Sequence, residues 1–331
     1  MRVLVTGASG FLGRAVVAAA VASGHEVVAL VRPVADVDRL EWPEEVEIVK
    51  GDLRQPGPWV DTLKDVGAVV HLAAAKRGDL AQQFNGTVVA TENLLEHLPM
   101  SSLQRFVHVS SFSVYDFASQ PVGGAVTETT PVEPRPDARD AYTVTKIVQE
   151  QLVRDACEAS STSHIVLRPG AIYGPGETWG HGSALRVGGF DLIFSPRAVL
   201  RLTFVENCAD AVVRAIEAPV PTGSTYNIVD DDLPTYSSYH RGCRKAGAAT
   251  GRAVFVPWFI VSGVGRAVAL LNRRAFRGSA KLPELLSHRR QSAAWKPFSY
   301  PNGPAKKGLS WTPRVAVDDG ISETVKGAPR A

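Results

Sequence analysis

Cysteine is scarce in this chain of 331 residues, and it is scattered. The three cysteines, Cys157, Cys208 and Cys243, lie far apart and form no CxxC pair. This usage is typical of reduced, structural cysteines in a cytoplasmic protein and not of a disulfide-stabilised secreted one. No cysteine and histidine residues cluster with the spacing of metal ligands, so the sequence predicts no metal site.

A strong excess of one charge is also missing. The chain has 36 Lys and Arg against 33 Asp and Glu, which gives a formal net charge of +3, and the basic residues are dispersed. Binding to nucleic acid is therefore not indicated. Hydrophobic residues at 45% and charged residues at 21% are typical of a globular protein. Because Met1 leads directly into a strand-like run, we expect no signal peptide.

Long apolar runs are rare, and residues 254–271 (VFVPWFIVSGVGRAVALL) are the exception. The run is at the short end for a membrane span, and Arg266 within it would be costly in a bilayer. We therefore expect no integral span and a buried or amphipathic helix that begins near Pro257. Contact with a membrane surface, or with a lipophilic substrate, is the alternative.

The first two thirds of the chain alternate between strand-like and helix-like runs. This alternation predicts an α/β fold, a Rossmann-type doubly wound parallel sheet that binds ligands beyond the carboxyl ends of its strands. From about residue 170 the pattern changes: residues 170–189 are Gly-rich and predict a loop, and the chain from about Leu233 predicts helices and loops. The predicted strands are 2–6, 26–31, 46–50, 68–72, 106–110, 165–167 and 226–229, and the main predicted helices end near Ser23 and Leu98 or cover 140–159 and 209–218.

A glycine-rich turn, TGASGFLG from Thr6 to Gly13, joins the first strand to the first helix. Its GxxGxxG spacing differs from the commoner GxGxxG fingerprint. Glycines let the backbone turn tightly and let a phosphate approach bare N–H groups at the start of a helix. A tight turn with close helix packing is the alternative. The predicted cofactor contacts here are Gly7, Ser9, Gly10, Phe11, Leu12 and Gly13.

Tyr142 and Lys146 form a Tyr-x-x-x-Lys pair. On a helix, residues i and i+4 share one face. A free tyrosine has a pKa of about 10, and a nearby ammonium lowers it. Tyr142 is thereby suited to exchange a proton with a substrate oxygen. Two ordinary surface residues on a helix are the alternative for the bare motif.

The glycine turn, the serines that follow Val109 and the Tyr142–Lys146 pair occur in an order that resembles the extended short-chain dehydrogenase/reductases. Within this epimerase/dehydratase superfamily the chain looks most like the 3β-hydroxysteroid dehydrogenase and dihydroflavonol-reductase branch. The resemblance implies that Ser111 orients the substrate and that Ser110 packs beside the cofactor. It implies further cofactor contacts at Asp52, Leu53, Leu72, Ala73, Ala74, Pro169, Gly170 and Ile172.

The resemblance also implies two lobes and a homodimer. The dinucleotide-binding domain would comprise residues 1–169 and about 203–230. A smaller C-terminal substrate-binding lobe would comprise about 170–202 and 231–331. We expect a cytoplasmic enzyme whose partner is a small-molecule substrate.

The function that this resemblance implies is NAD(P)-dependent interconversion of a secondary alcohol and a ketone on a small, apolar substrate. A sugar-nucleotide epimerase with the same Ser-Tyr-Lys triad is one alternative, and a non-catalytic dinucleotide-binding regulator is another. Ser111-Phe112-Ser113 stands where sugar-nucleotide dehydratases carry Thr-Asp-Glu, so dehydration is disfavoured.

The end of the second strand bears on the choice of cofactor. NAD-specific relatives usually place an acid at this strand tip, where it binds the adenosine ribose. Val31 occupies that position here, and Arg32 follows. Because an arginine can clamp a 2′-phosphate that a carboxylate would repel, the sequence predicts a preference for NADP(H), with NAD(H) as the alternative.

Overall fold

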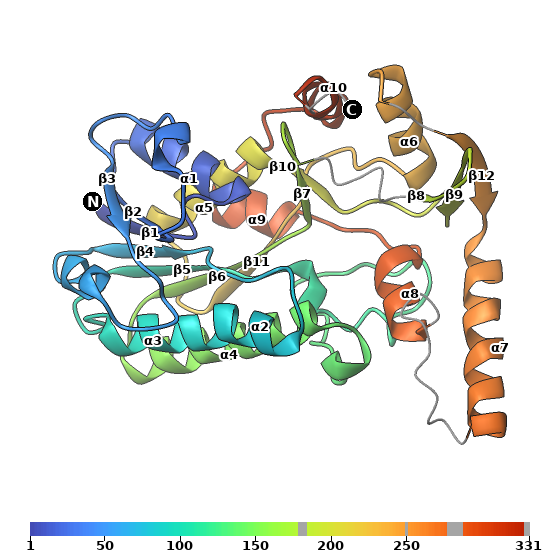
Figure 1. Cartoon of the computed structure of the whole chain (residues 1–331), viewed down its shortest axis with the longest axis horizontal. Coiled ribbons are helices and arrows are strands. Elements are labelled where there is room, and N and C mark those ends of the chain that lie inside the picture. The colour runs from blue at the N-terminus through green and yellow to red at the C-terminus, as the bar shows by residue number, and fades with distance from the viewer. Residues whose placement is uncertain (178–183, 249–250, 277–286, 328–331) are drawn as a thin grey trace.

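A parallel β-sheet forms the centre of the molecule (Figure 1). The computed structural model describes residues 1–177, 184–248, 251–276 and 287–327. Within them, seven strands pair in parallel in the order β11-β6-β5-β4-β1-β2-β3. This order contains the 3-2-1-4-5-6 arrangement of the doubly wound Rossmann fold, so the predicted fold class is confirmed. The strands are β1 (Arg2–Thr6), β2 (Glu26–Val31), β3 (Glu47–Lys50), β4 (Ala68–His71), β5 (Arg105–Val109), β6 (His164–Pro169) and β11 (Ser224–Ile228).

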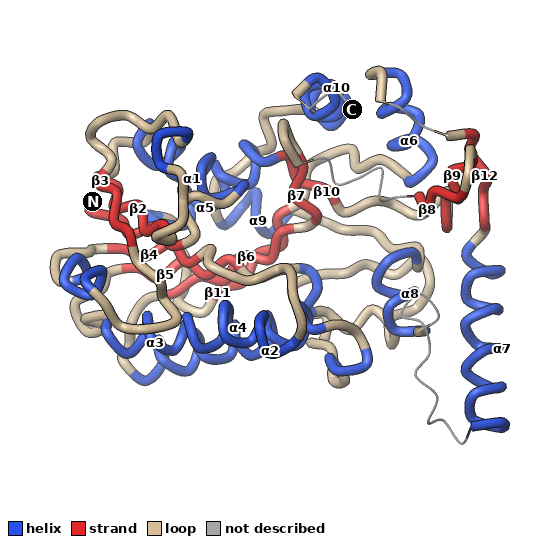
Figure 2. The backbone as a smooth tube through the Cα atoms, viewed as in Figure 1, coloured by secondary structure: helices blue, strands red, loops and turns tan. Residues whose placement is uncertain are grey.

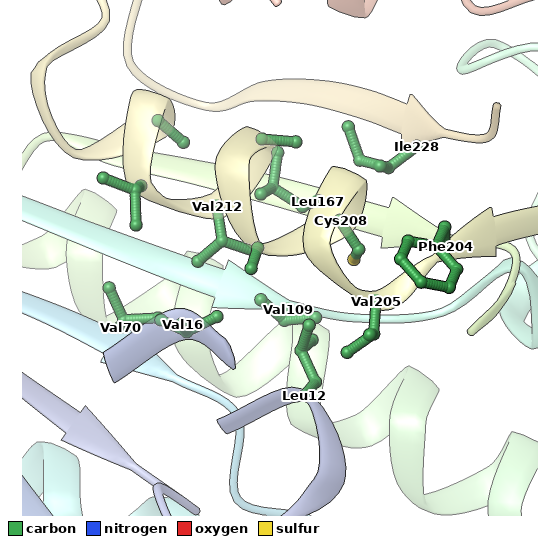
Figure 3. Packing of buried hydrophobic residues seen from close by; sticks show 14 of the residues in the cluster. Leu12, Val16, Val70, Val109, Leu167, Phe204, Val205, Cys208, Val212 and Ile228 are labelled. Atoms are coloured by element: carbon green, nitrogen blue, oxygen red, sulfur yellow. The ribbon is translucent and has the colours of Figure 1, made fainter. Parts of the chain in front are cut away.

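Helices cover both faces of this sheet (Figure 1). On one face lie α1 (Phe11–Ala22) and α5 (Val205–Glu217), and on the other α2 (Leu80–Phe84), α3 (Ala90–His97) and α4 (Ala141–Ala159). Figure 3 shows the core beneath the first pair: Leu12 and Val16 of α1 and Cys208 and Val212 of α5 pack over the apolar side chains of the strands.

The sequence predicts one long helix before Pro99, and the structure divides it. A π-helix, η3 (Asn85–Val89), separates α2 from α3. Asp79 is the N-cap residue of α2, and its carboxylate accepts the N–H of Gln82 in a reciprocal capping box. The helical stretch is therefore confirmed, with a wide turn in its middle that no local pattern indicated.

Helix α5 begins earlier than predicted. It starts at Val205, four residues before the predicted Ala209. The carboxylate of buried Asp230 accepts the backbone N–H of Phe204 at 2.7 Å, and Asn207 in the first turn donates to the same carboxylate at 3.0 Å. Asp230, two residues after the end of β11, thus fixes where α5 begins.

Two small sheets lie beyond the carboxyl edge of the main one (Figure 2). Residues 170–189 and the chain after Leu233 were predicted to lack strands, and this is wrong at β7, β8 and β12. Strand β12 pairs in parallel with β9, about 60 residues earlier, a contact that local sequence does not reveal. The strands are β7 (Ala171–Tyr173) with β10 (Leu202–Phe204), and β8 (Ala184–Val187), β9 (Phe190–Phe194) and β12 (Arg252–Val256).

The remaining helices are short, apart from α7. They are α6 (Tyr236–Lys245), α7 (Trp258–Phe276), α8 (His288–Trp295), α9 (Gly303–Gly308) and α10 (Val317–Lys326), with 3₁₀-helices at η1 (Val37–Arg39), η2 (Pro58–Leu63), η4 (Phe112–Val114) and η5 (Pro136–Ala138).

The apolar run at 254–271 is divided between two elements. Its first residues belong to β12, and α7 begins directly after Pro257, as predicted. The helix is not buried, because Phe259 is 72% and Leu271 63% exposed. Across the described residues, no helix combines the length and the apolar character that a membrane crossing requires.

The three cysteines are free and buried, which confirms their prediction as unpaired residues. No group of three or more potential metal ligands occurs in the described part of the chain.

The close packing of Gly13 yields a stability prediction. A Cβ at Gly13 would lie 2.5 Å from the carbonyl oxygen of Ala8, inside the turn that starts α1. We expect Gly13→Ala to lower the free energy of unfolding by about 1–3 kcal/mol, as overpacking typically does. Thermal unfolding measures it. Gly263→Ala is the control, because an added Cβ there meets nothing within 4 Å. Equal unfolding midpoints for Gly13→Ala and the native chain would contradict the prediction.

Candidate functional site

The glycine turn packs against the end of the neighbouring strand β4. Gly7 has φ +67°, and a Cβ there would lie 2.9 Å from the backbone nitrogen of Ala73. Only glycine satisfies both conditions without strain. The turn is thereby held beside Leu72, Ala73 and Ala74, which follow β4 and are half-buried.

The start of α1 is left open for an anion. Gly10 is the N-cap residue and offers no side-chain hydrogen bond, and the first turn of the helix contains no acidic residue. The first N–H groups of a helix have no partners within it, and its dipole favours negative charge there. Ser9 and Phe11 flank this position half-buried, and Leu12 anchors the helix in the core. These residues fit the pyrophosphate of a dinucleotide.

Tyr142 and Ser111 meet beyond the end of β5. Asp140 caps α4 by accepting the N–H of Thr143 at 2.7 Å, which places Tyr142 in the first turn of that helix. Ser111 accepts the N–H of Ser113 at 3.1 Å, so its own proton is available to Tyr142. Burial raises the pKa of Tyr142 above its usual value, and the hydrogen bond with Ser111 opposes that rise. The predicted pair of hydroxyl groups is therefore in contact.

Lys146 lies one turn further along α4 and is buried. Its ammonium donates to the carbonyl oxygen of Val109 at 2.8 Å and to Oε1 of Gln149 at 2.5 Å. Those are its two hydrogen-bond acceptors among the described residues, so one N–H is left for a ligand. Burial lowers the pKa of Lys146 to about 7.

Gln149 connects Lys146 to the middle of the sheet. Its amide nitrogen donates to the carbonyl oxygen of Ala73 and to the hydroxyl of Thr91, each at 2.9 Å. Both ends of the amide are thus satisfied, which fixes the carbonyl end toward Lys146. Gln149 was not among the residues predicted from the sequence, where its place three positions after Lys146, on the same face of the helix, is the one signal that points to it.

His71 completes this buried network as a neutral ring. Thr91 donates its own proton to the carbonyl oxygen of Thr87 at 2.6 Å, so it accepts from Nε2 of His71 at 2.9 Å. Nδ1 then accepts from the hydroxyl of Thr6 at 2.8 Å. Burial lowers the pKa of His71 to about 3. The ring is a hydrogen-bonded support of the site and carries no proton for catalysis.

A buried ion pair lies on the next turn of α4. Glu150 accepts two bonds from Arg168 of β6, at 3.1 and 2.5 Å. Burial alone would raise the pKa of Glu150, but Arg168 holds it at about 2. Ser110 is buried on this side of β5, toward Glu150, whereas Ser111 faces Tyr142.

Charged side chains gather where β2 and β3 end. Arg32 is exposed directly after β2. Asp52, after β3, is held by the guanidinium of Arg54 at 2.5–3.0 Å, and this pairing, with a smaller effect of Arg32, keeps the pKa of Asp52 below its usual value. Leu53 is buried in the core, and its carbonyl oxygen accepts from Asn93.

The stretch after β6 approaches the glycine turn from the other side. Pro169 is buried, and Gly170 and Ile172 are half-buried at the start of β7. A Cβ at Gly174 would lie 3.2 Å from the ring of Phe11, which shows how closely this stretch approaches α1. The predicted cofactor contacts therefore lie along the ends of β1 to β6, at one edge of the sheet.

Comparison with known proteins agrees with this geometry. The chain is 27% identical to 2-alkyl-3-oxoalkanoate reductase of Stenotrophomonas maltophilia, over 97% of both chains. It is 27% identical to ceramide reductase of Caulobacter vibrioides, over 98% of this chain and 93% of that one. Among solved structures, it resembles UDP-glucuronic acid 4-epimerase from Bacillus cereus in complex with NAD, with a TM-score of 0.73, 20% identity and coverage of 99% and 98%.

The model of one protein family matches most of the first two thirds of the chain. It is the NAD dependent epimerase/dehydratase family, matched over residues 3–229, which include the glycine turn, Ser111, Tyr142 and Lys146. The relatives reported above and others like them are named as reductases and dehydrogenases, and the structural neighbours include epimerases solved in complex with NAD. The chain is therefore an enzyme of the NAD dependent epimerase/dehydratase family, with the extended short-chain dehydrogenase/reductase architecture.

Proposed function

We propose that this enzyme interconverts a secondary alcohol and a ketone on a small, apolar substrate, with NADP(H) as its preferred cofactor. The observation that carries the proposal is the placement of Ser111, Tyr142 and Lys146. Ser111 lies close enough to Tyr142 to lower the pKa of its phenol, and Lys146 is fixed one helical turn away by Val109 and Gln149. Sequence-distant residues are thus joined at the edge where this family binds its cofactor.

The three residues have distinct roles. When bound, a nicotinamide cofactor would supply a hydride to the carbonyl carbon during reduction and would accept one from the alcohol during oxidation. Tyr142 donates a proton to the carbonyl oxygen during reduction and removes it during oxidation. Ser111 orients that oxygen with its hydroxyl. Lys146, while it is protonated, supplies a positive charge on the same helix face, and such a charge favours a phenolate at Tyr142.

An apolar substrate is supported by two relatives of the chain, and a buried aromatic core lies behind the triad. Phe112 follows Ser111 and packs edge-on against Tyr115 and Tyr300, with ring centroids 5.4 and 5.6 Å away. Phe117 and Phe298 continue this aromatic cluster. Two relatives that match nearly the whole chain are named for alkyl-oxo acid and ceramide reduction, and both kinds of molecule carry long apolar chains.

Replacing Tyr142 tests the triad. We expect Tyr142→Phe to lower kcat by about 10²–10⁴-fold, because it removes the proton-transfer group and almost no packing. Cofactor affinity, measured by fluorescence titration, should stay within a few-fold of native. Tyr226→Phe on β11 is the control, since it removes a hydroxyl outside the site. A Tyr142→Phe enzyme that turns over at the native rate would refute the assignment.

Replacing Gln149 tests how Lys146 is positioned. Gln149→Leu removes an acceptor that favours the charged amine, so the pKa of Lys146 should fall further below about 7. The active form needs the ammonium, and the alkaline limb of the kcat/KM profile should therefore move to lower pH. Gln149→Glu should move that limb to higher pH.

Gln151→Leu is the matched control for this pair of variants. Gln151 lies two residues along α4 on its exposed side, where it bonds Asp155. A merely structural role for Gln149 would lower the unfolding temperature and leave the pH limb where it is. Unchanged limbs in both Gln149 variants would therefore count against the proposed role.

The cofactor preference is supported by the charges after β2 and β3. Arg32 is exposed at the strand tip, and the carboxylate of Asp52 is already engaged by Arg54. Arg32 and Arg54 therefore carry two positive charges at this place, against the one negative charge of Asp52. Asp36 pairs with Arg39 at 2.9 Å, which turns it toward η1. This balance suits the 2′-phosphate of NADP(H).

Arg32→Ala tests this preference. A hydrogen bond to a charged group contributes about 1.5–3 kcal/mol, so kcat/KM with NADPH should fall by about 10–150-fold. The value with NADH should change little. Arg39→Ala is the control, because Arg39 is an exposed arginine in the same connection. Equal use of both cofactors by the native enzyme, or an unaltered ratio in Arg32→Ala, would contradict the role of Arg32.

A substrate series distinguishes the proposal from a sugar-nucleotide epimerase. We expect reduction of 3-oxo compounds, with kcat/KM rising by up to about fourfold for each added methylene that is buried, and no turnover of UDP-sugars. Absorbance of the reduced nicotinamide follows the reaction. Conversion of a UDP-sugar without net use of cofactor, together with inactivity on every ketone, would favour the epimerase.

The assembly, compartment and lobe boundaries are also proposals. A homodimer is supported by Leu80 and Phe84, which lie on one face of α2 and are 50% and 39% exposed. The free, buried cysteines suit the reducing cytoplasm. The two small sheets support a separate substrate-binding lobe at about 170–202 and 231–331.

A further inference from the structure

Helix α7 exposes its apolar side. Val261, Ser262 and Gly265 are buried, and a Cβ at Gly265 would lie 2.9 Å from Cδ of Gln291 on α8. This stripe therefore packs against α8. The opposite side carries five exposed apolar side chains: Phe259 (72%), Leu271 (63%), Leu270, Val264 and Ile260. An ordinary surface helix has the reverse arrangement, with its apolar stripe inward.

The neighbouring small sheet continues this apolar character. Leu185, Val187, Phe190, Val254 and Phe255 of β8, β9 and β12 are each 39–54% exposed. These strands and α7 lie together at the end of the molecule opposite β3 (Figure 1). Ten of the seventeen exposed large apolar side chains among the described residues fall here. We call these ten residues the apolar end. Such a concentration marks an interaction surface.

The charge of this part of the chain selects the partner. Residues 233–276 contain no Asp or Glu. Arg266 and Arg274 are exposed on α7, and Arg252 is exposed at the start of β12. The seven basic residues of the segment are Arg241, Arg244, Lys245, Arg252, Arg266, Arg273 and Arg274.

Among the described residues of 251–276, every exposed charged side chain is an arginine, and an apolar surface flanked by positive charge complements an anionic lipid surface. A second copy of the chain would bring two basic segments together, and like charges across an interface oppose binding. A zwitterionic surface would leave the arginines without partners. The combination of exposed Phe, Leu and Ile with arginines is that of helices which lie in the plane of a membrane interface.

Helix α8 connects the apolar end to the segment between Ser111 and Tyr142, which contains or adjoins the candidate catalytic residues. Arg289 of α8 pairs with Asp116 and Glu133, and Arg290 donates to the carbonyl oxygen of Arg139. Lys296 follows α8 and donates to backbone carbonyls at 117, 118 and 120. All these partners belong to the chain between Ser111 and Tyr142. A surface on which α7 docks is therefore held close to the segment between Ser111 and Tyr142.

We propose that α7 and the adjoining strands dock this enzyme on the surface of an anionic membrane, without crossing it. Phe259, Leu271 and their neighbours enter the boundary between headgroups and acyl chains, and Arg266 and Arg274 bind lipid phosphates. The enzyme then meets an apolar substrate where that substrate is dissolved. The docking stands on the surface alone, and only the delivery of substrate rests on the proposed function.

Vesicle co-sedimentation of the full chain tests the docking. One set of vesicles contains phosphatidylcholine alone, and the other contains phosphatidylcholine and phosphatidylglycerol in equal parts. We expect binding to the anionic vesicles to be at least about tenfold stronger and to weaken as salt is added. The double variant Phe259→Ser/Leu271→Ser should weaken it by at least about tenfold. Arg266→Glu should weaken binding to the anionic vesicles only.

The same vesicle experiment includes two control variants, and several of its outcomes would overturn the proposal. Val34→Ser and Val122→Ser remove exposed apolar side chains (85% and 59%) outside the apolar end and should bind as the native chain does. Equal sedimentation with both vesicle sets, or none, overturns the proposal. So does light scattering that shows an oligomer which Phe259→Ser/Leu271→Ser dissociates, because a second copy would then cover the surface.

Turnover of a water-soluble 3-oxo ester with NADPH separates the two proposals. This turnover should be unchanged in Phe259→Ser/Leu271→Ser, since both residues lie outside the candidate site. Loss of vesicle binding with intact turnover in that variant supports docking. Vesicle binding by a native chain that reduces no ketone overturns the proposed function and leaves the docking standing.

Discussion

The geometry of the site depends on the need to satisfy a buried ammonium. Lys146 is almost fully removed from water, and a charge in that position is tolerated only when it is hydrogen-bonded. Its two acceptors, the carbonyl oxygen of Val109 and the amide of Gln149, connect α4 to the ends of β5 and β4. His71 extends the connection to Thr6 at the end of β1. A shift of α4 along the sheet would break the bonds that Lys146 and Gln149 make to Val109 and Ala73. The need of Lys146 for hydrogen-bond acceptors therefore fixes the position of Tyr142 on the same helix.

A second buried charge holds the other half of α4. Glu150 and Arg168 bind each other twice, and the guanidinium of Arg168 stacks 4.7 Å above the ring of Tyr115. A buried ion pair is a weak source of stability compared with apolar packing, but breaking one is costly. Because breaking the pair is costly, it fixes the position of α4 along β6 to the one in which Glu150 meets Arg168. The helix is thus fixed by one polar contact set at Lys146 and another at Glu150, and Asp140 fixes its first turn.

The sequence was informative where structure is decided locally. Strands β1 and β2 match their predicted limits, because each is an unbroken apolar run between turn residues, and the glycine turn and the Tyr142–Lys146 helix were recognisable from spacing. Local pattern failed where distant partners decide. Strand β12 exists because β9 is beside it, and α5 starts at Val205 because Asp230 reaches it. Gln149 matters because Lys146, Ala73 and Thr91 lie around its amide. Residues such as Leu53 and Ser110, suggested by resemblance, turn out to be buried, and their contact with a cofactor remains a prediction.

The two ends of the molecule differ in which kind of side chain lies outside its preferred surroundings. At the sheet, charged groups are buried and must be paired, and the network around α4 pairs them. At α7, apolar groups are exposed, and nothing in the described chain covers them. Helix α8 joins the two regions, since one side packs on Gly265 of α7 and its arginines bind the acids and carbonyls that follow Ser111. Because these bonds are partly buried, a reorientation of α7 and α8 together would disturb the segment that leads from Ser111 to Tyr142. The surface that the enzyme exposes and the edge where it does chemistry are therefore positioned as one unit.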